Sequence, residues 1–506
     1  MNLNLSTLAL SELDCDLLVL PVFDAEIGEP SARSKALITV DALLDGALLE
    51  AAAQEKFNAR AESSFVLHTL GKLKARRVLL LGLGDSAHFD PEVLRMAAGK
   101  AAKIAAKSNA SSIALALADL PIDVSLRAAA EGLLLGHYAF KNYKTGKAAQ
   151  APSLASAALL LPDGMSVTDE LEAVLQQAIL VADSVNFARQ LVNTPAQDMT
   201  PTILAERAQD MAKATGLAIE VLDKPEIEKL GMGMFLAVAK GSSQAPKLIH
   251  VTWTPEGEAA KAPALALVGK GITFDAGGLS LKPSEGMVWM KTDMAGGAAV
   301  LGAMRAVAHI KPPFPVHAWI GACENMPGCS AYKLGDVLTS HAGKTVEIHN
   351  TDAEGRLVLG DVLSLAAEQK PALLVDLATL TGAIGTALGL YNTGLFASDD
   401  EAAQAVLDAA GEAGESTWRM PLDVRLRGEI DSPVADLKNS GERYGGSITA
   451  ALFLKEFVEK TPWVHLDIAG TARSKSERGY LDVGASGAGV RTLIELVRQR
   501  AAKQGE

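Results

Sequence analysis

The sequence predicts an α/β protein with a smaller N-terminal α/β domain and a larger α/β domain on a mixed, mainly parallel sheet with helices on both faces. Short apolar runs alternate with segments of helical periodicity, as βαβ units do. The 506 residues exceed what one hydrophobic core usually supports, and 49% hydrophobic residues are typical of globular proteins. A long helical stretch follows a proline and a glycine near residue 165. We therefore expect an N-terminal domain over 1–165, a connecting helix over 166–195 and the larger domain over 196–506.

The first domain begins with buried strands and continues into helices. Strands are expected at 17–23, 77–82, 113–117 and 157–161, where four to seven apolar residues follow one another with few interruptions. Helical periodicity predicts helices over 91–108 and 125–140, the first with a proline in its first turn. The GLGDS sequence at 82–86 lacks the full glycine spacing of a phosphate loop, so a plain strand-to-helix turn is expected there.

The second domain repeats this alternation on a larger scale. Strands are expected at 217–223, 248–255, 264–275, 316–325, 372–379 and 463–470, with helices between them, among them 295–309 and 447–459. The segment 372–390 has the length of a membrane span, but it contains Asp376, three threonines and three glycines. Such residues are poorly tolerated in lipid, so a buried strand, a glycine-rich loop and a helix are expected instead.

The net charge and the small number of cysteines exclude some classes of protein. The formal net charge is −13; residues 1–165 contain 16 basic and 18 acidic residues, and the remainder contains 31 and 42. This balance argues against a surface that follows nucleic-acid backbones throughout. Three cysteines form no disulfide framework, and Cys323 and Cys329 are expected to be packing residues. The N-terminus lacks the basic region of a signal peptide, so a cytoplasmic protein is expected.

The candidate catalytic and metal-binding residues lie in three glycine-rich loops of the second domain. Their charged residues are Lys270, Asp275 and Lys282 in the first, Asp293 in the second, and Asp352, Glu354 and Arg356 in the third. On extended chain, residues two apart point the same way, so the last three are expected to share a face. Four carboxylates can neutralise two divalent ions, the arrangement of two-metal hydrolases. Solvated surface acids with a salt bridge to Arg356 are the alternative, and spacing alone leaves both open. No HExxH, GxSxG or phosphate-loop motif is present.

These loops closely resemble the leucyl aminopeptidase (cytosol aminopeptidase) family. The run NTDAEGRL at 350–357 is identical to the family signature. Further similarity includes GKGITFD, LKPS, ENMP, LATLTGA and the W-x-H-x-DIAG pattern, and it covers most of 180–506. The resemblance implies two-metal enzymes that remove N-terminal residues from peptides.

Site residues follow from the resemblance position by position. It implies two divalent ions, Zn²⁺ or Mn²⁺ first and Co²⁺ or Mg²⁺ as alternatives, held by Lys270, Asp275, Asp293, Asp352 and Glu354. The two cations and burial would lower the pKa of Lys270, so that its neutral amine can bind a metal. A metal-activated water would attack the peptide, Lys282 would stabilise the oxyanion, and Arg356 would hold a bicarbonate that relays protons. The side-chain pocket for Leu-like residues would be formed by Met290, Thr379, Leu380 and Gly382.

Partners and competing functions complete the expectations. The resemblance implies a homo-hexamer that takes peptides with a free N-terminus and binds no membrane. A two-metal phosphoesterase would use the same carboxylates. Binding of a phosphate substrate would, however, require more arginines near the site than Arg356 alone. An additional DNA-binding or architectural role is the non-enzymatic alternative. It would use a basic stripe in the N-terminal domain, made of Arg95, Lys100, Lys103 and Lys107 with Lys141, Lys144 and Lys147. A solvated helix face is the more common meaning of such a stripe.

Overall fold

The computed structural model describes residues 1–117, 120–146 and 154–505, and the chain forms two compact units. The first unit runs from Met1 to Asn186 and includes Lys475–Val483; the second runs from Phe187 to Ser474 and resumes at Gly484. The division falls inside helix α6 (Asp169–Asn193), which occupies the segment expected to be a connecting helix. A short segment close to the C-terminus therefore folds with the first unit.

The first unit contains a six-stranded sheet. Its order is β1 (Asn2–Ser6), β6 (Ser156–Leu160), β5 (Ser112–Ala116), β2 (Leu17–Phe23), β4 (Arg77–Gly84) and β3 (Ser64–His68). All neighbours are parallel except β3, which is antiparallel to β4. The four strands expected from their apolar runs are confirmed, whereas the two edge strands β1 and β3 were not predicted. Both are only partly buried: apolar and polar residues alternate in β1, and β3 has only three consecutive apolar residues.

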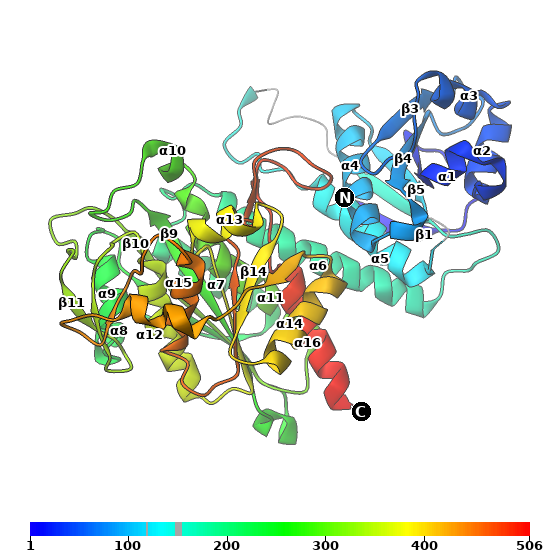
Figure 1. The fold of residues 1–506 in the computed structure, drawn as a ribbon. Helices are drawn as coiled ribbons and strands as arrows, with labels where there is room; N and C mark the ends of the chain where they lie inside the picture. Colours follow the sequence, from blue (N-terminus) through cyan, green and yellow to red (C-terminus); the bar gives the residue numbers. More distant parts are fainter. Residues whose placement is uncertain (118–119, 147–153, 506) are drawn as a thin grey trace. The chain divides into compact units, whose positions relative to one another are not determined.

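Helices cover both faces of this sheet (Figure 1). On one face lie α4 (Pro91–Lys107) and α5 (Ile122–His137); on the other lie α1 (Asp24–Gly28), α2 (Lys35–Leu43) and α3 (Ala47–Gln54). The Asp90 carboxylate accepts the N–H of Glu92 and so caps α4, and Pro91 occupies its first position. The two longer helices pack at glycines. A Cβ added to Gly136 would lie 2.3 Å from the carbonyl oxygen of Gly99, so only glycine permits this approach.

The second unit contains an eight-stranded sheet. Its order is β15 (Thr417–Arg419), β14 (Thr393–Ala397), β17 (Trp463–Asp467), β13 (Leu373–Ala378), β9 (Leu265–Asp275), β10 (Val316–Asn325), β8 (Lys247–Trp253) and β7 (Ala218–Leu222). The central strands β17, β13, β9 and β10 are parallel, and antiparallel pairs join β14, β8 and β7 to them. The expected mixed, mainly parallel sheet is confirmed. Because their carboxyl ends meet at one edge, the loops after β9, β10 and β13 come together.

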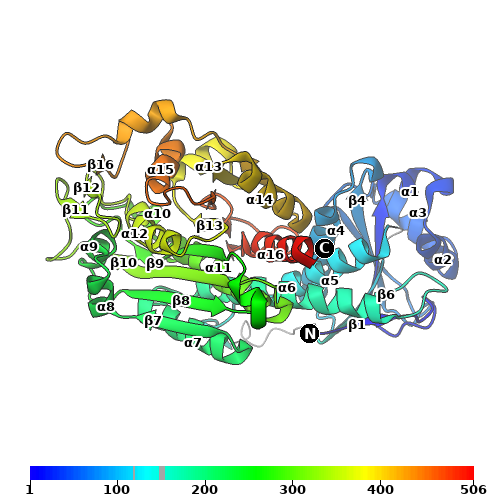
Figure 2. The ribbon, with the colours of Figure 1, turned by 90° about the horizontal axis from the view of Figure 1, so that it is seen from below.

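Two helix layers enclose this sheet (Figures 1 and 2). One layer contains α7 (Pro201–Thr215), α11 (Ala295–Ile310), α14 (Asp400–Ala413) and α16 (Val490–Gly505). The other contains α8 (Lys224–Lys229), α9 (Gly233–Ala239), α12 (Gly355–Glu368) and α15 (Gly446–Lys455). The core beneath the second layer is apolar and includes Phe235, Val358 and Trp463, all buried.

The remaining elements are short. They are α10 (Ser284–Met287), α13 (Gly382–Leu388), a small sheet of β11 (Val337–Thr339), β12 (Thr345–Glu347) and β16 (Leu437–Lys438), and the pair β18 (Arg473–Ser474) and β19 (Gly484–Ala485). The segment 372–390 forms β13, a loop and α13, as expected. Within the part of the chain that the structure describes, no helix has both the length and the apolar character that a membrane crossing needs.

Candidate functional site

The three glycine-rich loops meet at the carboxyl end of β9. Lys270 and Asp275 lie on β9 itself, and Asp293 lies in a 3₁₀ helix, Met290–Met294, directly before α11. The start of α11 presses closely against the strand. A Cβ on Gly269 would lie 2.5 Å from the Cα of Gly297, so glycine is needed there. This close approach brings Asp293 next to Lys270, 23 residues earlier in the chain.

Three carboxylates form a buried cluster at this point. Asp275, Asp293 and Glu354 are each at most 4% exposed, and each offers an oxygen within 4.8 Å of the others. Oδ2 of Asp293 and Oε2 of Glu354 are buried without a hydrogen-bond partner. Burial raises the pKa of Asp275 and of Asp293, and the neighbouring carboxylates raise it further. Oxygen atoms crowded in this way fit a divalent cation, and the alternative of solvated surface acids is wrong because these three side chains are buried.

Lys270 lies inside the cluster and is 3% exposed. Its Nζ lies 2.8 Å from Oδ1 of Asp293, 2.8 Å from Oε1 of Glu354 and 3.0 Å from the carbonyl oxygen of Thr379. Burial alone would lower the pKa of this amine, but Asp293, Glu354 and Asp275 together raise it above its ordinary value. The lowered pKa expected from the sequence therefore depends on the charge of bound cations, which oppose these carboxylates.

Lys282 joins the fourth carboxylate to the cluster. Its Nζ lies 2.8 Å from Oδ2 of Asp275 and 2.5 Å from Oδ1 of Asp352. Burial opposes the positive charge, but Asp275, Glu354 and Asp352 raise the pKa of Lys282 above its ordinary value, so the amine is protonated near neutral pH. Asp352 is more open than the other three acids, with a side chain 33% exposed. The lysine thus holds a positive charge at the rim of the cluster.

The expectation that Asp352, Glu354 and Arg356 share a face is wrong. Thr351 and Asp352 lie in a turn, and Glu354 already has helical dihedral angles (φ −74°, ψ −36°). Arg356 lies in the first turn of α12, so this segment is not the extended chain that the alternation requires. Asp352 contacts Lys282, Glu354 contacts Lys270, and Arg356 donates from Nη1 to the carbonyl oxygen of Asn439 at 2.9 Å. Arg356 is 8% exposed, and burial lowers its pKa to about 10 although Glu354 and Asp467 oppose that change.

A hydrogen-bond network that the sequence reasoning missed joins the first and third loops. Its centre is Thr351, which is fully buried. The Thr351 hydroxyl donates to the carbonyl oxygen of Gly277 and accepts the N–H of Ser280, both at 2.7 Å. The amide of Asn325 donates to Oδ1 of Asp275 at 2.7 Å and to the Thr351 carbonyl oxygen at 2.9 Å. Both residues lie inside the quoted motifs NTDAEGRL and ENMP, but uncharged side chains give no signal of a metal site.

The four residues that are expected to form the pocket for the substrate side chain lie in different elements and make different contacts. Thr379 donates its hydroxyl to Oδ1 of Asp293 at 2.7 Å, and Leu380 donates its backbone N–H to Asp467 at 3.1 Å. Gly382 begins α13, and Met290 begins the 3₁₀ helix that carries Asp293. Thr379 is therefore placed at the cluster, while the pocket itself stays a prediction.

The basic stripe of the first unit is engaged within that unit. Arg95 is 2% exposed and its Nε lies 2.7 Å from Glu131, while Lys100 donates to the Glu62 carbonyl oxygen. Lys103 lies 2.6 Å from Asp482, and Lys107 lies 2.5 Å from Glu477. Two of these acids belong to the returning segment Lys475–Val483. Three of the seven basic residues, Arg95, Lys103 and Lys107, are thus paired with acids, and Arg95 and Lys103 are buried rather than solvated. Lys147 lies outside the described residues.

The cysteines divide by environment. Cys323 lies on β10 and is fully buried, as expected, and burial raises the pKa of its thiol. Cys329 is exposed, so its expected role as a packing residue is wrong. It follows the end of β10 in an open loop, where the packing that would bury a thiol is lacking.

Comparison with known proteins agrees with this geometry over nearly the whole chain. Residues 186–494 match the catalytic domain of the cytosol aminopeptidase family, and residues 19–147 match its N-terminal domain. A probable cytosol aminopeptidase of Alkaliphilus metalliredigens is 43% identical over 493 residues, 97% of each chain. One of Acidobacterium capsulatum is 43% identical over 510 residues, covering 99% of this chain and 100% of the relative.

Solved structures show the same fold. A mutant of tomato leucine aminopeptidase superposes with a TM-score of 0.90 at 36% identity, covering 99% of this chain and 96% of that one. The bottromycin maturation enzyme BotP in complex with Mn superposes with a TM-score of 0.83 at 34% identity, covering 96% of this chain and 100% of that one. Family, fold and the buried acidic cluster lead to one conclusion. The chain belongs to the cytosol aminopeptidase family and is a metal-dependent aminopeptidase.

Proposed function

We propose that this aminopeptidase uses two divalent cations held by Lys270, Asp275, Asp293, Asp352 and Glu354. The observation that carries the proposal is the buried cluster of Asp275, Asp293 and Glu354, in which one oxygen of Asp293 and one of Glu354 have no hydrogen-bond partner. Unpaired buried carboxylates are costly, and a cation bound between them removes that cost. The complex of BotP with Mn supports manganese as one metal, and the oxygen-rich ligand set also suits zinc.

The chain's own residues would supply orientation and charge around the metals. When bound, the cations polarise the peptide carbonyl and lower the pKa of a water molecule toward neutrality. Lys282 places its ammonium group between Asp275 and Asp352 at the rim, where it would stabilise the carbonyl oxygen as negative charge develops. Thr379 holds Asp293 in place through its hydroxyl, which donates to Oδ1 at 2.7 Å.

Arg356 would hold an anion beside the cluster. Its Nη1 is bound to the Asn439 carbonyl, which fixes the guanidinium plane in a buried place. A guanidinium carries five N–H donors in a planar fork, and the remaining donors suit a planar oxyanion such as bicarbonate. An anion held there by Arg356 would supply a proton-accepting and proton-donating group beside the metal site.

Substrate choice follows from the same arrangement. A free α-amine on the substrate would be recognised at the Lys270 and Asp293 side of the cluster, and Met290, Thr379, Leu380 and Gly382 would accept a Leu-like side chain. An N-acetylated peptide is expected not to be cleaved, because acetylation removes the amine. Rapid cleavage of N-acetyl-Leu-p-nitroanilide would contradict this part of the proposal.

One experiment tests the proposal as a whole. The purified protein is dialysed against a chelator and reloaded separately with Mn²⁺, Zn²⁺ or Co²⁺, with metal content measured each time. Leu-p-nitroanilide and p-nitrophenyl phosphate are then assayed in parallel. We expect two metal ions per chain to restore cleavage of the amide only. Full peptidase activity without metal would overturn the metal proposal, and preferential phosphate release would favour a phosphoesterase.

We also propose that the chain forms a homo-hexamer in the cytoplasm, as the family resemblance implies. Sedimentation velocity of the metal-loaded protein would give one species of about six chains. A monomer at micromolar concentration would contradict it.

A further inference from the structure

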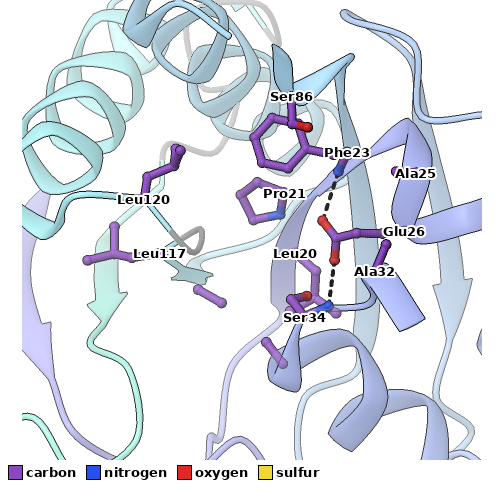
Figure 3. Close-up of a pocket in the computed structure, with 12 residues that line it drawn as sticks. Leu20, Pro21, Phe23, Ala25, Glu26, Ala32, Ser34, Ser86, Leu117 and Leu120 are labelled. Atoms are coloured by element: carbon purple, nitrogen blue, oxygen red, sulfur yellow. Dashed lines mark hydrogen bonds between the residues drawn. The ribbon is translucent and has the colours of Figure 1, made fainter. Parts of the chain in front are cut away.

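A cavity of about 270 Å³ lies in the first unit, remote in sequence from the metal-site residues. The described residues that line it lie at the end of β2, in α1, at the start of α2, and at or near the end of β5 as Ala116, Leu117 and Leu120. Leu20, Pro21 and Phe23 line one side, and Leu117 and Leu120 line another (Figure 3). None of the peptidase residues discussed above contributes to it.

The position of the cavity in the sheet is one where α/β proteins bind ligands. From β2 the chain proceeds through α1, α2, α3 and β3 to β4, on one side of β2. From β5 it proceeds through α5 to β6, on the other side. The connections therefore diverge at the carboxyl ends of the neighbouring strands β2 and β5, and a crevice opens between them. The 270 Å³ cavity is lined by residues from both of these strand ends.

The local backbone shapes this crevice. The register between β2 and β4 shifts by one residue at the end of β2, because Val22 lies opposite Gly82 but Phe23 lies opposite Gly84. Such irregularities redirect side chains and are frequent beside binding sites. The Phe23 ring is held by Phe89 in an edge-to-face contact, with centroids 5.7 Å apart. An aromatic ring in a fixed orientation can therefore serve as one wall.

The polar chemistry of the cavity is acidic. Glu26 is 6% exposed; Oε1 accepts the N–H of Phe23 and Oε2 accepts the N–H of Ser34, both at 2.9 Å (Figure 3). A carboxylate has about four acceptor positions, so acceptor capacity is left for a ligand that donates hydrogen bonds. No lysine or arginine is among the described residues that line this space. An anionic ligand would meet Glu26 without a compensating charge.

We propose that this cavity binds a neutral aromatic heterocycle that carries an N–H donor. The ring would pack between Phe23, Pro21 and Leu117, and its N–H would donate to Glu26. Indoles and nucleobases share this chemistry. Of the GLGDS turn, only Ser86 lines the cavity. The glycine-rich backbone that would bind a phosphate group is therefore not part of the cavity wall.

The ligand test uses the full-length protein and three matched probes. Indole, 1-methylindole and indole-3-carboxylate are titrated into the millimolar range by calorimetry and by saturation-transfer NMR. Indole is expected to bind, and the other two to bind at least about five-fold more weakly, because one lacks the N–H and the other adds a negative charge. A parallel titration with adenine distinguishes a nucleobase site from an indole site by the tighter ligand. Absence of binding by both indole and adenine, or equal binding of the anion, would overturn the proposal.

The site is located by filling the cavity. Ala36 lies in the first turn of α2 and lines the cavity, whereas Ala53 is exposed on α3. Ala36→Leu and Ala53→Leu make the same change in two helices, and leucine is nearly as good a helix former as alanine. We expect Ala36→Leu to weaken indole binding at least ten-fold and Ala53→Leu to leave it unchanged.

A second variant covers the possibility that Ala36→Leu unfolds the unit, which a thermal melt would reveal. Ser86 is exposed at the rim of the cavity, so Ser86→Trp is expected to fold and to weaken binding by narrowing the entrance. Binding unchanged in a folded Ala36→Leu protein and in Ser86→Trp would place the ligand elsewhere and overturn the assignment.

Discussion

The hydroxyl of Thr351 accepts the backbone N–H of Ser280 at 2.7 Å, although 71 residues separate them in the chain. This bond fastens the loop of Asp275 and Lys282 to the loop of Asp352 and Glu354. A second bond runs the other way, from the Thr351 N–H to the Ser280 hydroxyl at 3.2 Å. The spacing of the acidic groups is therefore held by uncharged residues.

Replacing Thr351 tests this positioning role. Thr351→Val keeps the shape and removes the hydroxyl, leaving the N–H of Ser280 without this partner. We expect metal affinity to fall about 10–100-fold, the usual cost of losing a group that orients metal ligands. Calorimetric titration of Mn²⁺ measures it directly. Thr351→Ser restores the hydroxyl and is expected to recover most of the affinity; a valine variant with unchanged affinity would refute the role.

Removing one buried carboxylate should remove metal and activity together. Glu354→Gln leaves the side chain nearly isosteric but deprives Lys270 of one ion-pair partner and the cluster of one charge. We expect bound metal to fall by at least one ion per chain and kcat/KM for Leu-p-nitroanilide to fall at least about 100-fold. Glu285→Gln, at an exposed position in α10, is the matched control and should change neither. Retention of both ions in Glu354→Gln would show that this carboxylate is no ligand.

Removal of the Lys282 ammonium group is expected to lower kcat. Lys282→Met keeps much of the aliphatic volume and removes the ammonium group between Asp275 and Asp352. Loss of one group that stabilises a developing oxyanion typically lowers kcat about 10²–10³-fold. Metal content and KM should change far less than kcat. Steady-state kinetics with metal analysis separate these effects, and an unchanged kcat would exclude the proposed charge stabilisation.

A buried acid outside the metal cluster should make stability depend on pH. Asp361 in α12 is fully buried and accepts the N–H groups of Phe235 and His341 at 2.9 and 2.8 Å. Burial raises its pKa to about 7, despite these two hydrogen bonds. The folded state therefore keeps its proton to higher pH than the unfolded chain does. Its stabilising contribution is complete below the unfolded value of 3.8 and is lost as pH rises through about 7.

Asp361→Asn removes this titration. Between pH 5 and pH 8 the free energy of unfolding of the natural chain should fall relative to the variant by about 2–3 kcal/mol, since each pKa unit corresponds to about 1.4 kcal/mol. Urea unfolding at the two pH values measures the difference. A constant difference between the two proteins would show that Asp361 titrates alike in the folded and unfolded states.

The comparison of sequence with structure is clearest at Arg356 and Lys103. Alternation along the chain placed Arg356 beside Asp352 and Glu354, but α12 begins at Gly355 and turns Arg356 toward Asn439. The basic stripe of α4 was visible from its spacing, yet Lys103 is paired with Asp482, 379 residues away. Periodicity describes neighbours on one element, so it cannot reveal partners supplied by distant segments.

By itself, the sequence determined the alternation of strands and helices, the glycine-rich loops and the charged residues within them, because each depends on neighbours a few residues apart. Only the tertiary structure decided which charges are buried together. It placed Asp275, Asp293 and Glu354 around Lys270, and it recruited Asn325 and Thr351 to hold the loops. The free energy of a charged side chain depends on its burial and on its hydrogen-bond partners. Those partners are tens to hundreds of residues away in the chain, so they come together only once the sheet has formed.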